Sequence, residues 1–298
     1  MKRSRHEFLD PKVLARLSRG QVQARLPMSG SMSGQHRSPH KGSSVEFAEY
    51  RKYVPGDDIR LLDWRVYARS DRFYLKEFEA DTNLRAYFVL DCSASMSFAG
   101  SGESKLAYAR KMIAALAWLL VQQGDAVGLS CFSDKAMPDI PARRNPAHLG
   151  NIFDGLAALK PAGETALASS LHKLAEKIPQ RSLVLIFSDC FTPVEGLLSC
   201  FQHLRFRKND LAVFQLLDRA ELDFDFSRPT RFVDLETSAT LLAEPETIRS
   251  RYFTELNAFL NALKSGCREF NAEYRLVVTD DDYEKAIANF LIERARKK

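Results

Sequence analysis

The sequence lacks the features that mark several large classes of protein. Its five cysteines include no C-x-x-C pair, and an odd number does not suit a disulfide framework. It has no G-x-x-x-x-G-K-[ST] motif, so the chain does not supply an ATPase of its own. The first 25 residues are basic and broken by Pro11 and Gly20, unlike a secretory signal. The most apolar helical stretch, 113–121, is too short to span a bilayer. We therefore expect a cytoplasmic protein with no membrane span.

The positive charge is unevenly distributed. The chain of 298 residues has a net charge of +5, yet residues 1–41 alone carry nine Lys and Arg against two acids. We interpret residues 1–44 as a basic N-terminal arm and linker, with a short docking helix after Asp10-Pro11 and a flexible Ser/Gly/His-rich stretch over 28–44. Interleaved aromatic residues are missing from this arm, so we do not expect nucleic acid as a partner.

Residues 45–83 predict a small β-rich unit. Apolar residues alternate with polar ones, and Pro55-Gly56 marks a turn. We expect Trp64 to be anchored inward and the hairpin predicted over 223–245 to join this unit as a second β layer. Acids and arginines of the segment predict a network of Arg–carboxylate pairs that fixes the unit to the main sheet: Asp57, Asp58, Asp63, Arg51, Arg60, Arg65 and Arg69.

From residue 84 onward, strands and helices alternate, which predicts a parallel sheet with helices on both faces. The fold class is therefore α/β, a doubly wound, mostly parallel sheet formed by 84–222 and 246–298, with the smaller β-rich unit appended. The expected strands are 84–91, 125–132, 183–188, 211–217 and 274–279, and the expected helices are 104–122, 146–159, 165–178, 246–265 and 282–296.

Oxygen-bearing side chains follow two of these strands. Asp91, Ser93 and Ser95 follow the apolar run 84–90, and Asp189 follows 183–188. Ligands bind at the carboxyl ends of strands in open α/β sheets, so we expect these residues to meet in one crevice. Thr165, with a hydroxyl free at a helix start, belongs to the same set. Oxygen donors without thiol or imidazole suit Mg²⁺.

The order Asp91-x-Ser93-x-Ser95, Thr165, Asp189 resembles the metal-ion-dependent adhesion site (MIDAS) of von Willebrand factor A domains. Cys190 departs from the pattern, because those domains often have glycine after the acid. An upstream run narrows the resemblance to a bacterial family of unknown function, number fifty-eight, whose genes accompany MoxR-type AAA+ ATPases: Arg51-x-Tyr53-x-Pro55-Gly56-Asp57-Asp58-x-Arg60, then Asp63-Trp64 and Ala68-Arg69.

The resemblance implies a binding device without turnover. In such sites the serines and the threonine contact Mg²⁺ (or, as an alternative, Mn²⁺), the acids act mostly through water, and a partner protein supplies an Asp or Glu to the open position. The resemblance also implies a partnership with a MoxR-type AAA+ ATPase in chaperone-like complex maturation.

An enzymatic alternative remains open on the residues alone. Mg²⁺-dependent phosphohydrolases also place an acid after the first strand of an α/β sheet. Those that resemble the haloacid dehalogenase type need a second Asp two residues on, where this sequence has Ser93. We therefore expect binding rather than catalysis.

Overall fold

The structure is a computed structural model. It describes residues 8, 10–18, 20–25, 33–55, 57, 59, 62–82, 84–100, 102–133, 138–163 and 167–296, with the backbone alone at 33–51, 76–82 and 167. These ranges hold the main sheet, its helices and two smaller β ribbons.

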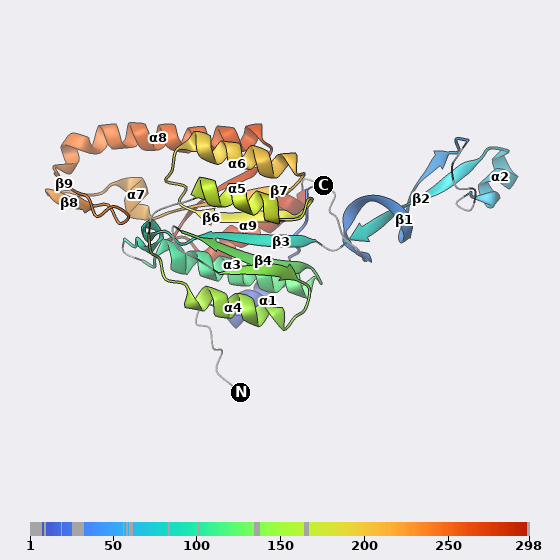
Figure 1. Cartoon of the computed structure of the whole chain (residues 1–298), viewed down its shortest axis with the longest axis horizontal. Helices are drawn as coiled ribbons and strands as arrows, with labels where there is room; N and C mark the ends of the chain where they lie inside the picture. The colour runs from blue at the N-terminus through green and yellow to red at the C-terminus, as the bar shows by residue number, and fades with distance from the viewer. Residues whose placement is uncertain are drawn as a thin grey trace.

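A six-stranded sheet forms the centre of the molecule, in the order β10-β7-β6-β3-β4-β5 (Figure 1). Its five parallel strands are β3 (Arg85–Asp91), β4 (Ala126–Phe132), β6 (Leu183–Ser188), β7 (Asp210–Leu217) and β10 (Glu273–Val278). An antiparallel edge strand that the sequence pattern did not predict, β5 (Asp139–Arg143), pairs with β4. The strand order reverses at β3, which lies between β4 and β6. The predicted α/β fold is confirmed.

Helices cover both faces of this sheet and account for its continuous apolar strands. One apolar cluster lies under α1 (Pro11–Leu17), α3 (Lys105–Gln122), α4 (His148–Ala158) and α9 (Tyr283–Arg296). The other lies under α5 (Leu167–Lys177), α6 (Val194–Phe206) and α8 (Pro245–Glu269). Every residue of β6 and β7 is buried as a result.

Part of the N-terminal arm is docked on this body. Asp10 caps α1 by accepting a hydrogen bond from the Lys12 amide (2.8 Å), as the Asp-Pro pair predicted. Arg16 pairs with Glu284 of α9, and Val22 is fully buried. The flexible stretch predicted over 28–44 is wrong from Ser33 onward, because the backbone there is strand.

The segment after this arm differs from the prediction in its middle. Strands β1 (Ser33–Lys52) and β2 (Tyr74–Thr82) form an antiparallel ribbon, but α2 (Trp64–Ser70) interrupts the expected β unit. Asp63 caps α2 by accepting hydrogen bonds from the amides of Arg65 (2.9 Å) and Val66 (3.3 Å). The inward anchor predicted at Trp64 is wrong, since this side chain is 59% exposed. Of the predicted arginine network, Asp58 and Arg60 lie outside the described part of the chain and Arg51 is described by its backbone alone, so the network stays a prediction.

The predicted hairpin exists but does not join β1 and β2. Helix α7 (Arg219–Asp223) leads into β8 (Thr230–Val233) and β9 (Thr240–Ala243), which pair with each other in a sheet of their own. Phe224 stacks on Tyr252 of α8 (ring centroids 4.3 Å apart) and on Phe232 (5.5 Å). This aromatic packing fixes the hairpin to α8, so the predicted joint β layer is wrong. Figure 1 shows the two ribbons at opposite ends of the view.

Candidate functional site

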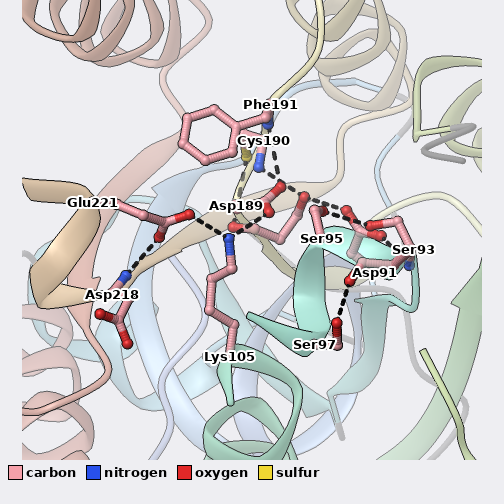
Figure 2. Close-up of polar contacts among 12 residues, drawn as sticks. Asp91, Ser93, Ser95, Ser97, Lys105, Asp189, Cys190, Phe191, Asp218 and Glu221 are labelled. Atoms are coloured by element: carbon pink, nitrogen blue, oxygen red, sulfur yellow. Dashed lines mark hydrogen bonds and ion pairs between the residues drawn. The ribbon is translucent and has the colours of Figure 1, made fainter. Parts of the chain in front are cut away.

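The end of β3 positions the first acid. Asp91 is its last residue and is fully buried. Its Oδ1 accepts a hydrogen bond from the Ser93 amide (2.9 Å), and its Oδ2 accepts one from the Ser188 hydroxyl (2.6 Å) (Figure 2). The chain then turns through a short 3₁₀ helix, Ala94–Ser97, which brings the hydroxyl oxygens of Ser93 and Ser95 to 3.0 Å from each other. Three predicted site residues therefore lie together.

The end of β6, the neighbour of β3, positions the second acid. Asp189 is fully buried, and its backbone carbonyl accepts a hydrogen bond from Gln215 of β7 (3.0 Å). Ser188 connects the two strand ends, because its hydroxyl donates to Asp91 and accepts from the Cys190 amide (2.9 Å). Asp91 and Asp189 therefore lie near each other at the ends of the paired strands β3 and β6, as the sequence predicted.

Cys190 adopts a backbone conformation that glycine favours. Its φ is 60°, in the left-handed region that side chains with a β-carbon adopt at a cost of about 1–2 kcal/mol. The loop after β6 therefore holds residue 190 in a backbone conformation that glycine would adopt without this cost. Burial raises the pKa of its thiol well above the usual value, and the nearby carboxylates of Asp189 and Asp91 add to this. A thiol that stays protonated is a poor metal ligand.

Thr165 lies outside the described residues, so its predicted role as a ligand stays a prediction. The loop that precedes Thr165 is joined to the loop after β3 by two backbone hydrogen bonds. Ala94 donates to the Gly163 carbonyl (3.0 Å), and Ala162 donates to the Cys92 carbonyl (3.0 Å).

A buried lysine beside Asp189 was missed by the sequence analysis. The Lys105 Nζ atom donates to Asp189 Oδ2 (2.7 Å) and to Glu221 Oε1 (2.9 Å), and the residue is 1% exposed. The rings of Phe98 and Phe191 flank the ammonium, with centroids 5.8 and 5.3 Å away. One signal could have found it: Lys105 is the first residue of α3, and a helix amino terminus disfavours positive charge.

Negative charge exceeds positive charge at this edge. Among the described residues of this edge, Asp91, Asp189 and Asp218 are buried, and Lys105 is the one buried cation. Burial, together with the charge of Asp189, raises the pKa of Asp91 to about 7. Burial would lower the pKa of Lys105, but the carboxylates of Asp189 and Glu221 outweigh it and raise that pKa. The acids would gain from a further cation at this place.

The donor chemistry fits a hard divalent ion. Asp91, Ser93, Ser95 and Asp189 offer carboxylate and hydroxyl oxygens, which Mg²⁺ prefers in proteins. Within the described ranges no three His, Cys, Asp or Glu residues are grouped as a metal cluster would require. A site here would therefore depend on hydroxyl groups as well as acids.

Comparison with known proteins identifies relatives over most of the chain. A family described as "Protein of unknown function DUF58" matches residues 49–258. Uncharacterized protein Rv1480 of Mycobacterium tuberculosis (strain ATCC 25618 / H37Rv) is 30% identical over 193 residues, which are 64% of this chain and 61% of that protein. Uncharacterized protein Mb1516 of Mycobacterium bovis matches with the same identity and coverage. The match thus spans about three fifths of these curated relatives.

Two solved structures resemble the chain more distantly. The conserved hypothetical protein BatB from Bacteroides thetaiotaomicron is 14% identical, with a TM-score of 0.48, over 72% of this chain and 100% of that one. An aerotolerance-related membrane protein from Bacteroides fragilis is 15% identical, with the same TM-score and coverage. In the described part of the present chain, no helix is both long and apolar enough to cross a membrane.

Proposed function

Because the chain belongs to the DUF58 family and gathers oxygen donors at the carboxyl edge of its sheet, we propose that it is a Mg²⁺-dependent protein-binding module. Asp91, Ser93, Ser95 and Asp189 would hold the ion, with Thr165 as the fifth ligand. The ion would offer an open coordination position to an Asp or Glu of a partner protein.

One observation carries this proposal. Two carboxylates, Asp91 and Asp189, are fully buried at neighbouring strand ends, and only Asp189 has a cation as partner among the described residues. A buried acid without a counter-ion is unfavourable, as the raised pKa of Asp91 reflects. A bound cation would compensate for the buried charge. The serine hydroxyls, being neutral, would leave the ion electrophilic toward an incoming carboxylate.

The partner is inferred from the family resemblance. We propose a MoxR-type AAA+ ATPase, with the chain acting in chaperone-like complex maturation in the cytoplasm. Two features support this setting: the sequence carries no P-loop of its own, and its five cysteines are all free and buried, as suits a reducing compartment. Bound Mg²⁺ would supply the electrostatic attraction for an acidic side chain, and no covalent bond would be made or broken.

The metal part is tested by thermal unfolding in Mg²⁺ and in EDTA. Mg²⁺ should raise the melting temperature of the wild-type chain, because an ion that binds only the native state stabilises it. The Asp91→Asn variant should lose this response, while Asp225→Asn, which alters an acid that is 93% exposed, should keep it. An equal response of all three proteins would place the ion elsewhere.

The partner part is tested by calorimetry with the purified MoxR-type ATPase. Binding should be measurable in Mg²⁺ and lost in EDTA, and Asp91→Asn should lose it in both. Identical affinity in Mg²⁺ and EDTA would contradict a carboxylate-to-metal contact.

The alternative, a Mg²⁺-dependent phosphohydrolase, has less support. Such an enzyme needs an acid or base beside its nucleophilic carboxylate. Two residues after Asp91 the chain has Ser93, whose hydroxyl lies 3.0 Å from that of Ser95. A phosphatase assay with p-nitrophenyl phosphate and Mg²⁺ would revive this alternative if turnover disappeared in Asp91→Asn.

A further inference from the structure

Lys105 is placed where a divalent cation would feel its charge. Within the described residues it is the one Lys or Arg that forms an ion pair with Asp189, and its side chain is 1% exposed. A buried ammonium is unfavourable unless acids pair with it. Two acids do so here, from different elements: Asp189 after β6 and Glu221 in α7.

Glu221, the second acid that pairs with Lys105, is itself held by further hydrogen bonds. Glu221 also accepts the Asp218 amide through Oε2 (2.7 Å), which completes a capping box at the start of α7. The Glu221 carbonyl accepts the hydroxyl of Tyr252 from α8 (2.6 Å). Lys105 is therefore fixed between two anchored carboxylates, and it does not have the freedom of a surface lysine to turn away from the site.

The order in which these side chains lie in space determines the charge near the two serines. Figure 2 shows the Lys105 ammonium between Glu221 on one side and Asp189 on the other, with Asp91 and Ser93 beyond Asp189. One oxygen of Asp189 is thus occupied by the ammonium. A divalent ion bound among the serines would be attracted by Asp91 and Asp189 and repelled by Lys105.

Charge balance then indicates what completes the site. Asp91, Asp189 and Lys105 together carry one net negative charge when ionised, and a divalent ion would turn this into one net positive charge. A single carboxylate from outside would neutralise it. Glu221 is left out of this count because it pairs with Lys105 from the side opposite Asp189, farther from the serines than the ammonium is.

We infer that Lys105 is a positioning residue that weakens the site for the bare cation, so that stable cation binding requires an anionic ligand from the partner. This inference rests on the proposed function and specifies its regulation: metal and acidic partner bind with positive coupling, and neither binds tightly alone.

The test is Mg²⁺ calorimetry on the full chain, with sodium acetate as the carboxylate probe against sodium chloride at equal ionic strength. Lys105→Met should bind Mg²⁺ alone at least tenfold more tightly than wild type. Acetate should strengthen Mg²⁺ binding several-fold in wild type and much less in the variant. The double variant Lys105→Met/Glu221→Gln removes both partners of one ion pair, so Glu221 is not left charged without its lysine. It should also bind Mg²⁺ alone more tightly than wild type.

Two control variants isolate the charge. Lys111→Met/Glu103→Gln removes a second Lys–Glu pair of the same helix region (2.7 Å), half-buried and outside the site, and should leave Mg²⁺ affinity unchanged. Lys105→Arg keeps the charge and should keep both the weak affinity and the acetate effect.

The sign of the change distinguishes the outcomes. If Lys105 only stabilises the fold, its removal will lower Mg²⁺ affinity or leave it unchanged, and either result overturns the inference while the proposed function stands. If wild type binds no Mg²⁺ with or without acetate, the proposed function fails, and the inference fails with it.

Discussion

Among the described residues, each edge of the central sheet has one buried cation, and the acids around the two cations are paired differently. At the amino edge, Arg294 of α9 pairs with Asp210 (2.9 Å) and Glu273 (3.0 Å), and Glu273 has a second partner in Arg275 (2.6 Å). At the carboxyl edge, Lys105 pairs with Asp189 (2.7 Å) and Glu221 (2.9 Å). Both side chains are nearly inaccessible, at 0% exposure for Arg294 and 1% for Lys105.

The difference lies in how the buried acids are paired. At the amino edge, the two acids bound by Arg294 share two arginines, and the N-terminal segment closes this network through the Gln23 carbonyl, which accepts from Arg294 (2.7 Å), and the Arg25 amide, which donates to Asp210 (2.8 Å). A third buried acid of that edge, Asp125, accepts the Leu84 amide (2.9 Å). At the carboxyl edge, Asp91 and Asp218 are also buried, and the described residues there include no buried cation besides Lys105. Burial and the charge of Asp189 raise the pKa of Asp91 to about 7, which makes the carboxyl edge the candidate place for a further cation.

Removal of the amino-edge cation should have the largest effect. Arg294→Met leaves Asp210 and Glu273 buried without their main partner, which should lower the free energy of unfolding by about 3–5 kcal/mol. Urea unfolding measures this. Arg296→Met, an exposed neighbour on α9, should change it by less than about 0.5 kcal/mol. A loss below about 1 kcal/mol for Arg294→Met would mean that the buried ion pairs of the amino edge do not stabilise the fold.

The carboxyl edge should instead respond to pH. The pKa of Asp91 is raised from 3.8 to about 7, so between these values the native state binds a proton that the unfolded chain has released. The stability from this group is therefore present below about pH 4 and lost as pH rises through about 7. At roughly 1.4 kcal/mol per pKa unit, this shift of about 3 units corresponds to a loss of about 4 kcal/mol in EDTA.

The variant Asp91→Asn isolates this contribution, because its amide does not titrate. Urea unfolding in EDTA from pH 4 to pH 8 should show a steeper fall for wild type than for Asp91→Asn. Parallel curves for the two proteins would mean that the pKa of Asp91 is the same in the native and the unfolded state.

A smaller effect should separate two serines of the same turn. Ser95→Ala removes a half-buried hydroxyl beside Ser93 and should weaken Mg²⁺ binding about tenfold, or about 1.4 kcal/mol, by calorimetry. Ser97→Ala removes an exposed hydroxyl that donates to the Ala94 carbonyl (2.6 Å) and should leave Mg²⁺ affinity unchanged. Equal losses in both variants would assign the effect to the turn rather than to a ligand.

The smallest effect should come from Cys190→Gly. Glycine relieves the strain at φ 60°, worth about 1–2 kcal/mol, but loses the contacts of a buried thiol of similar value. We expect the free energy of unfolding to change by less than about 1 kcal/mol. Cys200→Gly, at a buried helical position without positive φ, should destabilise by about 2 kcal/mol or more. Equal losses would mean that residue 190 is not strained.

Local pattern explains why the sequence could place the candidate site residues at the carboxyl edge of the sheet. A continuous apolar strand such as 84–90 places its next residues at the carboxyl edge whatever the details of packing, so Asp91, Ser93 and Ser95 followed directly. Asp189 was found in the same way after 183–188. The strand order that brings β3 beside β6 confirmed their meeting. Thr165 depends on the same reasoning and stays untested.

Residues whose role depends on distant packing could not be predicted in this way. Trp64 is apolar enough to be expected inside, but Asp63 caps a helix and leaves the ring 59% exposed. The hairpin 223–245 carries a valid strand pattern, yet Phe224 and Tyr252 decide where it packs. Strand patterns fix pairing within a hairpin and say little about its neighbours.

The sequence by itself determined the alternation of strands and helices and the oxygen donors at two strand ends, because both follow from short-range periodicity and the polarity of successive residues. Only the tertiary structure decided the charge of the site. Lys105 is separated from Asp189 by 84 positions and from Glu221 by 116. Electrostatic energy depends on distance in space, so the folded sheet alone determines which charges lie next to the oxygen donors of the candidate site.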